Sequence, residues 1–528
     1  MIRHGGAIAA VLLVVGSGAG AQLTPTARPS RDWRPTDRTI VGDFTWITSV
    51  AAASNRIYAT SPASLLIWNP QFERWEGAFD PPEPGLLSRV FTGLVDPLDN
   101  SLWLGRPDGW VHYQPDVQQW TSGTAAGVVQ EIAFDLNAPA QGLLLRTSAG
   151  WQAVPRGGFT SIPAAPPGRP AGPIALSELL RSSPALQANS AQILLDNRMR
   201  SVRFTAAARA FDRRGVYIGT AGNGLLYLPE GSAIPQRLSF GLPGGVIGAV
   251  YSAPGGVWAG NDRTAQSEAG ITFVASDLSD FQVHQGPAAT GFPFSQIRRF
   301  VGQADALWAA TDFGVARMES ETGRVRVIDQ AAGLPDSRVY AIVSRRGHIT
   351  AATARGIVRI DDSLRVRRVA PSFTSGALAL ALSGDTTWAG TGSGLLMTIG
   401  DSSPMVRPPG LNTASLQVPV VGLAWLGDTL VAMTEEQLMW RAPHGGWSLG
   451  PRLSPTVGRL RALAASGNGF WVGGDLGIAY ARLTSPALRP LLTGDVPGQV
   501  FDLAVDLDYL WVATSGGLAR FRLDAIAP

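Results

Sequence analysis

Four polar residues occupy the same position in a repeating sequence pattern: Gln296, Arg338, Arg459 and Gln499. Each stands directly before a short run of small and aliphatic residues that is typical of a buried strand. Guanidinium groups gathered at one place can bind a carboxylate, a phosphate or an acidic glycan. The sequence therefore predicts a ligand-binding site at these four positions. The alternative interpretation is that these side chains only contact solvent.

Several kinds of chemistry are excluded by composition. The 528 residues include no cysteine and no lysine, so all 43 basic residues are arginine. Thiolate metal sites, cysteine nucleophiles and Schiff-base or nucleotide-binding lysines are therefore absent. The histidines His112, His284, His348 and His444 each lie alone in their part of the sequence, without the spacing of metal ligands. We expect no catalytic residues, no metal and no cofactor.

The charge is nearly balanced, with 43 basic against 40 acidic residues. Long basic runs, which would indicate nucleic-acid binding, do not occur. We therefore expect no nucleic-acid partner.

The N-terminus has the pattern of an export signal. Arg3 and His4 precede an apolar run at 7–15, and small residues at 19 and 21 mark a cleavage site before Gln22. No other uncharged apolar run is long enough to span a membrane. We therefore predict a signal peptide at 1–21, a linker at 22–37, no transmembrane span, and a periplasmic or secreted protein. An uncleaved anchor is the alternative.

One phrase recurs along the chain: a β-prone run around a large residue, then small residues, a turn, and glycine with an aliphatic residue. Eight of the ten spacings between its eleven copies lie between 38 and 45 residues, which is the period of a four-stranded propeller blade. The copies centre on Tyr58, Trp103, Leu145, Tyr217, Trp258, Trp308, Thr350, Trp388, Val431, Trp471 and Trp511.

A second phrase, Gly-Leu-Pro or a variant, lies 17 residues before several of these anchors, for example at 333–335 before Thr350. The two phrases keep a fixed distance and therefore belong to one structural unit. We expect the glycine-proline loop to enter the innermost strand, the anchor to lie in the second strand, and Trp75, Trp120 and Trp447 to lie in outer strands.

The string from Gly333 to Val339, followed by Thr353 to Ile357, resembles the two-component-regulator propeller repeat. The resemblance covers about residues 38–528, less the segment 155–205. It also extends to the propeller part of a type IX secretion accessory protein. The repeats indicate about 11–12 four-stranded blades, which is more than the usual four to eight of one ring, so we expect two rings. The resemblance implies an all-β propeller fold. It implies little about function, because the family includes sensors, secretion components and proteins of other roles.

The chain divides at a Pro/Ala-rich segment. We expect blades 1–3 at 38–154, an insertion at 155–204 with short helices at 174–186 and 190–195, and blades 4–11 at 205–528. The insertion is either a loop that decorates one blade or a crossover between the two rings.

The last repeat lacks an outer strand, and the β-prone run 39–44 lacks inner strands. We therefore expect 39–44 to complete the last blade. We also expect the first three blades to share a ring with the last ones, with a division near residue 285 as the alternative.

These features favour an exported, non-enzymatic binding or scaffold protein of the bacterial cell envelope. Its expected partner is an envelope protein or an acidic glycan. The alternative is a periplasmic hydrolase or lyase that uses the mouth of the propeller channel.

Overall fold

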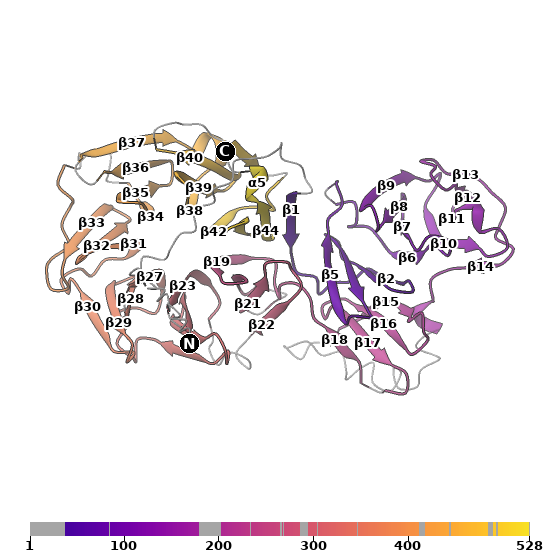
Figure 1. Ribbon diagram of the computed structural model, residues 1–528, viewed down its shortest axis with the longest axis horizontal. Coiled ribbons are helices and arrows are strands. Elements are labelled where there is room, and N and C mark those ends of the chain that lie inside the picture. Colours follow the sequence, from indigo (N-terminus) through magenta and orange to yellow (C-terminus); the bar gives the residue numbers. More distant parts are fainter. Residues whose placement is uncertain are drawn as a thin grey trace, which may run out of the picture.

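The computed structural model describes residues 37–526, apart from 84, 179–201, 233, 265–266, 268, 286–293, 304, 346, 411–417, 443–444, 484–488 and 493–494. The predicted signal peptide and nearly all of the predicted linker lie outside the described residues. The strands form two lobes that lie side by side (Figure 1). Among the helices in the described part of the chain, none is long and apolar enough to cross a membrane.

The described strands form eleven antiparallel sheets, and each of the eleven anchor residues lies in the second strand of one sheet. Trp75, Trp120 and Trp447 lie in fourth strands, as predicted. The all-β propeller fold is therefore confirmed. The repeat phrase forms the second strand of each blade, and its large side chain fills the space between neighbouring sheets. Trp103, Trp471 and Trp511, for example, are at most 2% exposed.

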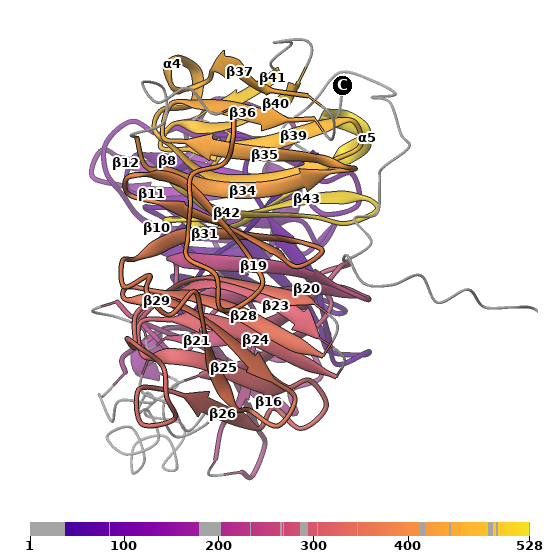
Figure 2. The same cartoon turned by 90° about the vertical axis from the view of Figure 1, so that its left-hand side faces the viewer.

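The larger lobe is a closed ring of seven blades. The innermost strands β19, β23, β27, β31, β34, β38 and β42 contact one another in this order, and β42 contacts β19. Figure 1 looks down on this ring, and Figure 2 shows its strands from the side. The strands are β19 (Ile247–Ala253), β20 (Gly256–Asn261), β21 (Gly270–Ala275), β22 (Phe281–Gln285), β23 (Ile297–Gln303), β24 (Ala306–Thr311), β25 (Gly314–Glu319), β26 (Val325–Ile328), β27 (Val339–Arg345), β28 (His348–Thr353), β29 (Gly356–Asp361), β30 (Val366–Val369), β31 (Ala377–Ser383), β32 (Thr386–Thr391), β33 (Gly394–Ile399), β34 (Val420–Leu426), β35 (Thr429–Thr434), β36 (Gln437–Arg441), β37 (Trp447–Arg452), β38 (Leu460–Ser466), β39 (Gly469–Gly474), β40 (Gly477–Arg482), β41 (Arg489–Leu492), β42 (Val500–Val505), β43 (Tyr509–Thr514) and β44 (Gly517–Arg522).

The ring is closed by the N-terminal strand β1 (Arg38–Val41). It pairs antiparallel with β44, so that Arg38 lies opposite Phe521 and Val41 lies opposite Leu518. The pairing expected between 39–44 and 518–522 is therefore present, over the first part of that run. The two ends of the ring's chain therefore share one sheet, and β1 supplies the fourth, outer strand of the last blade. Two short helices, α4 (Ser454–Val457) and α5 (Leu523–Ile526), complete this lobe.

The smaller lobe has four blades, whose inner strands contact one another in the order β10, β6, β2 and β15. Its strands are β2 (Ser49–Ala52), β3 (Ile57–Thr60), β4 (Leu65–Asn69), β5 (Arg74–Phe79), β6 (Thr92–Val95), β7 (Leu102–Arg106), β8 (Gly109–Gln114), β9 (Gln119–Thr124), β10 (Val129–Asp135), β11 (Leu143–Thr147), β12 (Gly150–Val154), β13 (Ile162–Pro163), β14 (Pro170–Ala171), β15 (Phe204–Arg209), β16 (Gly215–Thr220), β17 (Leu225–Pro229) and β18 (Gln236–Leu238), with the 3₁₀ turn η2 (Pro139–Gln141).

The described part of the insertion joins the third and fourth blades of this lobe. Strand β14 pairs with the inner strand β10, and Ile174 and Leu176 pack against the blade β15–β18. This segment thus spans the gap between two blades of one lobe, and it is not a crossover between the two lobes. The helices expected at 174–186 and 190–195 lie mostly or wholly outside the described residues.

The expected division of the blades between the rings is wrong. Residues 49–238 form the smaller lobe, and residues 247–522 together with β1 form the ring. The division therefore lies between 238 and 247, not near 285, and the first three blades do not share a ring with the last ones. The physical reason is that β1 closes the ring before the chain enters the smaller lobe, so the smaller lobe is inserted between closing strand and first blade.

Candidate functional site

The seven inner strands of the ring share one local geometry at their first residues. In each of them a β-bulge separates the first residue from the third. A bulge leaves its extra residue unpaired and turns that side chain out of the regular alternation. The bulged residues are Gly248, Arg298, Tyr340, Leu378, Val421, Arg461 and Phe501. This end of the inner strands, together with the residues just before them, is called the channel mouth below.

The turns from second to third strands lie at the same end. The backbone N–H of Ala354, for example, donates to the carbonyl of Arg338, and that of Ser515 donates to the carbonyl of Gln499. A threonine closes this turn in five of the seven blades: the Thr311 hydroxyl, for example, donates to the Gly314 carbonyl at 2.8 Å. Gly314 has φ of 122°, and a Cβ there would lie 2.3 Å from a carbonyl oxygen, so glycine is required.

The structure places all four predicted site residues at equivalent positions of the channel mouth. Gln296, Arg338, Arg459 and Gln499 are exposed, and each directly precedes the buried first residue of an inner strand. Gln296 and Arg338 come from neighbouring blades, as do Arg459 and Gln499. Two complete blades separate Arg338 from Arg459, so the four residues form two pairs and not one cluster.

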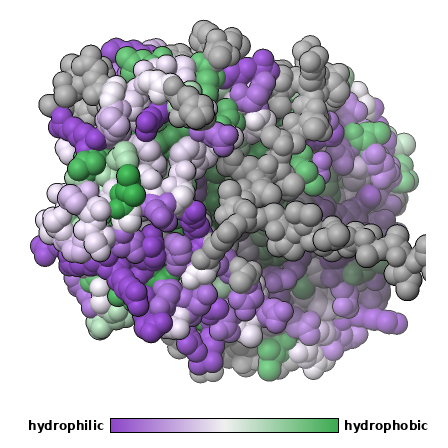
Figure 3. Space-filling view, turned by 60° about the vertical axis from the view of Figure 1, so that its left-hand side comes forward, coloured by the Kyte–Doolittle hydropathy of each residue, from purple (hydrophilic) through white to green (hydrophobic). Residues whose placement is uncertain are grey.

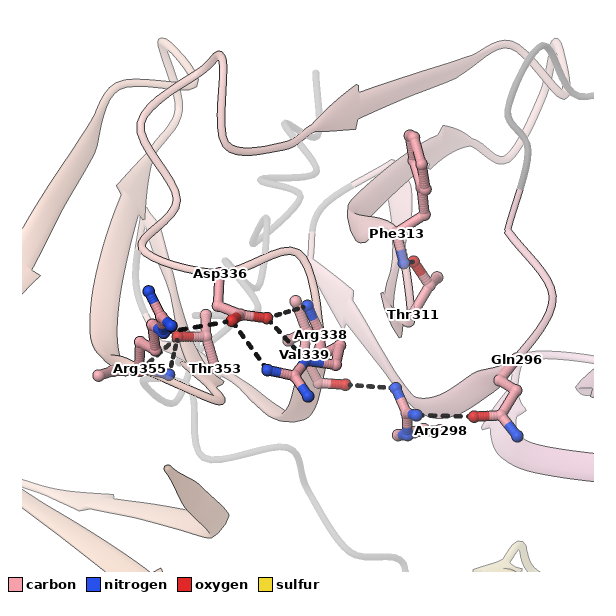
Figure 4. Close-up of polar contacts among 10 residues, drawn as sticks. Gln296, Arg298, Thr311, Phe313, Asp336, Arg338, Val339, Thr353 and Arg355 are labelled. Atoms are coloured by element: carbon pink, nitrogen blue, oxygen red, sulfur yellow. Dashed lines mark hydrogen bonds and ion pairs between the residues drawn. The ribbon is translucent and has the colours of Figure 1, made fainter. Parts of the chain in front are cut away.

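The predicted arginines already have acidic partners. The Nε of Arg338 donates to Asp336 Oδ1 at 3.0 Å, and its Nη2 donates to Asp336 Oδ2 at 3.1 Å. Arg459 pairs with Glu435 from the preceding blade. Arg355 lies 3.9 Å from the second oxygen of Asp336. Figure 4 shows Asp336 between Arg338 and Arg355. These guanidinium groups are therefore not free cations at the channel mouth.

Arg298 and Arg461, at two of the bulged positions, also lie at the channel mouth and were not among the predicted site residues. Arg298 links the first pair: its Nη2 donates to Gln296 Oε1 at 2.6 Å, and its Nη1 donates to the Val339 carbonyl at 3.4 Å (Figure 4). Its guanidinium group also lies over the Tyr340 ring. Arg461 donates to Asp475 at 2.5 Å. Each of these arginines stands two residues after a predicted site residue in the sequence. That position indicates the channel mouth only when the β-bulge, which the structure shows, is known.

Three carboxylates lie at the channel mouth: Asp262 and Asp312 directly follow second strands, and Asp336 lies in the loop before the inner strand β27. Asp336 has its pKa held below the usual value, mainly by the hydrogen bond from Arg338. Burial favours a higher pKa for Asp312, but hydrogen bonds from Ser295 and the Gln296 backbone outweigh it and lower the pKa. Asp262 differs, since burial raises its pKa to about 6 despite the hydrogen bond from the Ile297 backbone. Asp262 thus gains a proton more readily than its neighbours.

A further ion pair crosses the channel side of the ring. Arg299 of β23 pairs with Asp502 of β42, although β19 lies between these two strands. Asp502 is 1% exposed and also accepts the Val250 N–H at 3.2 Å and the Leu503 N–H at 2.9 Å. Burial raises its pKa, and Arg299 opposes that rise. This pair therefore joins the second and last blades of the ring across the inner strand of the first blade.

Within the described part of the chain, no three His, Asp or Glu side chains are grouped as metal ligands would be. His112 donates or accepts a hydrogen bond with the Ser101 hydroxyl at 2.8 Å and stacks on Trp103. Burial lowers its pKa. His444 lies outside the described residues.

Comparison with known proteins finds similar structures but no matching family. No family model matches the chain, and neither does any curated protein. One similar structure is the extracellular domain of a protein described as a hybrid two-component system from B. thetaiotaomicron, with 15% identity and a TM-score of 0.45, covering 90% of this chain and 68% of that chain. Another is PorZ, a surface component of the type IX secretion system of Porphyromonas gingivalis, with 13% identity and a TM-score of 0.46, covering 90% and 68%.

Virginiamycin B lyase from Staphylococcus aureus matches over a shorter part, covering 53% of this chain and 95% of its own, with 16% identity and a TM-score of 0.44. The extracellular domain of a two-component system and PorZ are proteins of the kinds that the repeat phrases resemble. At these identities the likeness concerns the fold.

Proposed function

We propose that this protein is an exported, non-enzymatic binding or scaffold propeller of the bacterial cell envelope. In this proposal the channel mouth of the seven-bladed ring holds an envelope protein or a glycan. The observation that carries it is the set of exposed Gln and Arg side chains at equivalent positions around one end of a closed ring. Such a rim offers many hydrogen-bond donors on a rigid frame.

The arginine pairs define the chemistry of the partner. Arg338 uses its Nε and Nη2 for Asp336, and within the described residues its Nη1 has no partner, while 57% of its side chain is exposed. Asp336 already balances its charge. A ligand that presents hydroxyl, carbonyl or single carboxylate oxygens therefore suits this position better than a dense polyanion.

Asp262 supports the alternative, a hydrolase or lyase at the channel mouth. A carboxyl group with a pKa of about 6 is suited to donate or accept a proton near neutral pH. Arg298 is near enough to lower that pKa. This alternative requires a second reacting group supplied by the substrate or by another residue.

The test is affinity capture from envelope fractions with the full exported chain. We expect one stable partner to be captured by the wild-type protein. The double variant Arg338→Ala/Arg459→Ala should lose it, while Arg326→Ala/Arg367→Ala should keep it, because those two exposed arginines lie on outer strands. Equal capture by both variants would contradict the proposal. Turnover of an envelope polysaccharide by pure protein, abolished by Asp262→Asn, would establish the enzymatic alternative instead.

A further inference from the structure

The smaller lobe carries exposed apolar side chains at the tips of its hairpin turns. All of them lie in turns that join first to second or third to fourth strands. Each is between 41% and 72% exposed. These residues, called the apolar-tip face below, are Phe72, Leu98, Val117, Leu136, Phe159, Phe211 and Ile234.

The topology places these seven tips at one end of the lobe. In every blade the strands run antiparallel from the inside outward, so first-to-second and third-to-fourth turns emerge at the same end. Each of the four blades contributes at least one tip, and three of them contribute two.

Polar contacts hold neighbouring tips together. Arg156, beside the turn of Phe159, donates to Asp96 of the turn that carries Leu98 at 2.7 Å, and to the Pro139 carbonyl, in the turn that follows Leu136, at 3.0 Å. The Tyr58 hydroxyl donates to the Asn100 carbonyl at 3.1 Å, which joins the first two blades. These contacts join the turns of the first three blades to one another.

The seven-bladed ring does not share this feature. Its first-to-second turns consist largely of Gly, Asp and Asn, and Leu507 is the one exposed large apolar residue that the structure describes in them. The side of the ring in Figure 3 is mostly hydrophilic, with isolated hydrophobic side chains. Exposed apolar residues in first-to-second turns are thus found in three of the four blades of the smaller lobe, at Leu98, Leu136 and Phe211, but in only one described turn of the ring.

We propose that the apolar-tip face docks on a zwitterionic phospholipid bilayer, with the tips inserted at the boundary between headgroups and acyl chains. Single apolar tips spread over four blades need a partner that deforms around each of them, and the bilayer interface does so. A rigid protein partner would need a separate pocket for every tip.

The charges around the tips complement a zwitterionic headgroup layer. The Arg74 guanidinium lies over the Phe72 ring at 5.4 Å, and Arg213 and Arg214 follow Phe211. Carboxylates stand beside the same tips, at Glu73, Asp99, Asp116 and Asp212. The arginines can bind lipid phosphates and the carboxylates can bind ammonium groups, whereas a strongly anionic surface would be repelled by the carboxylates.

The first experiment is flotation of the purified full chain with vesicles of phosphatidylethanolamine and phosphatidylcholine. Each inserted phenylalanine should contribute about fivefold to tenfold to the partition coefficient, so Phe72→Ser/Phe159→Ser/Phe211→Ser should lower it by about a hundredfold or more. The control Phe313→Ser/Leu449→Ser/Val406→Ser removes three apolar side chains of the ring that are 43–56% exposed, and it should bind as the wild type does. Binding should change little with salt.

The second experiment uses the absence of cysteine from the chain. A single cysteine at Phe159→Cys, labelled with an environment-sensitive dye, should lose water contact on vesicles, whereas the same label at Leu449→Cys should not. No vesicle binding, equal binding by both triple variants, or a dye at 159 that stays hydrated would each overturn the proposal. So would a concentration-dependent dimer that the tip variant alone abolishes, because the face would then bind a second copy of the chain.

Discussion

Replacing Trp511 by alanine should strongly destabilise the ring at the seam between its last and first blades. Trp511 is 0% exposed and belongs to the apolar cluster that joins β43 to the blade β19–β22. Truncating a buried tryptophan costs about 3–5 kcal/mol. Its Nε1 also donates to Asp506 at 2.7 Å, but Asp506 is half-buried and regains water when the indole is lost. We therefore expect a loss of about 4 kcal/mol in unfolding free energy.

Trp471 provides a matched comparison that separates packing from hydrogen bonding. It is also 0% exposed, but its Nε1 has no hydrogen-bond partner within the described residues. Both changes to alanine should cost about 3–5 kcal/mol, because each removes a fully buried indole. The change Trp511→Phe should cost about 1 kcal/mol more than Trp471→Phe, because only the former breaks a hydrogen bond to a carboxylate.

The assay is urea denaturation followed by circular dichroism, which does not depend on the deleted fluorophore. The m-value should stay constant across the series. Unfolding free energies of the alanine variants within about 0.5 kcal/mol of the wild type would refute the assignment of these side chains to the seams. Equal costs for the two phenylalanine changes would refute the role given to Asp506.

Three further predictions concern the ring and its export. Arg299→Ala should lower stability more at about pH 7 than at about pH 4. Burial already raises the pKa of Asp502, and the loss of Arg299 raises it further, so ionising this carboxyl as pH rises costs more stability in the variant. Thermal melts at several pH values measure this difference, and a stability loss that is larger in acid would contradict the prediction. Deleting residues 39–44 should open the last blade, lower the melting temperature and expose residues 517–522 to proteolysis. An unchanged melting temperature and unchanged resistance to proteolysis would show that β1 is dispensable. The exported protein should begin at Gln22 by mass spectrometry, and an intact Met1 in that fraction would refute the signal peptide.

The sequence by itself determined the blades. The anchor at Trp511 and its ten counterparts fixed the second strand of every sheet, because a large residue followed by small ones and a turn suits only that place in a blade. The missing outer strand of the last repeat likewise predicted the pairing of Val41 with the C-terminal sheet. Both inferences rest on local pattern and strand number, which a sequence displays directly.

The division into lobes and the chemistry of the mouth were decided only by tertiary structure. Which inner strands meet depends on how blades of similar sequence curve around an axis. Neither the contact of β19 with β42 nor that of β15 with β2 could therefore be predicted from the residues of these strands. The pairing of Arg459 with Glu435 spans 24 residues, and that of Arg299 with Asp502 spans 203. Such contacts depend on blade packing and on the bulge of each inner strand, so the sequence could place the arginines at the channel mouth but could not show that carboxylates already neutralise them.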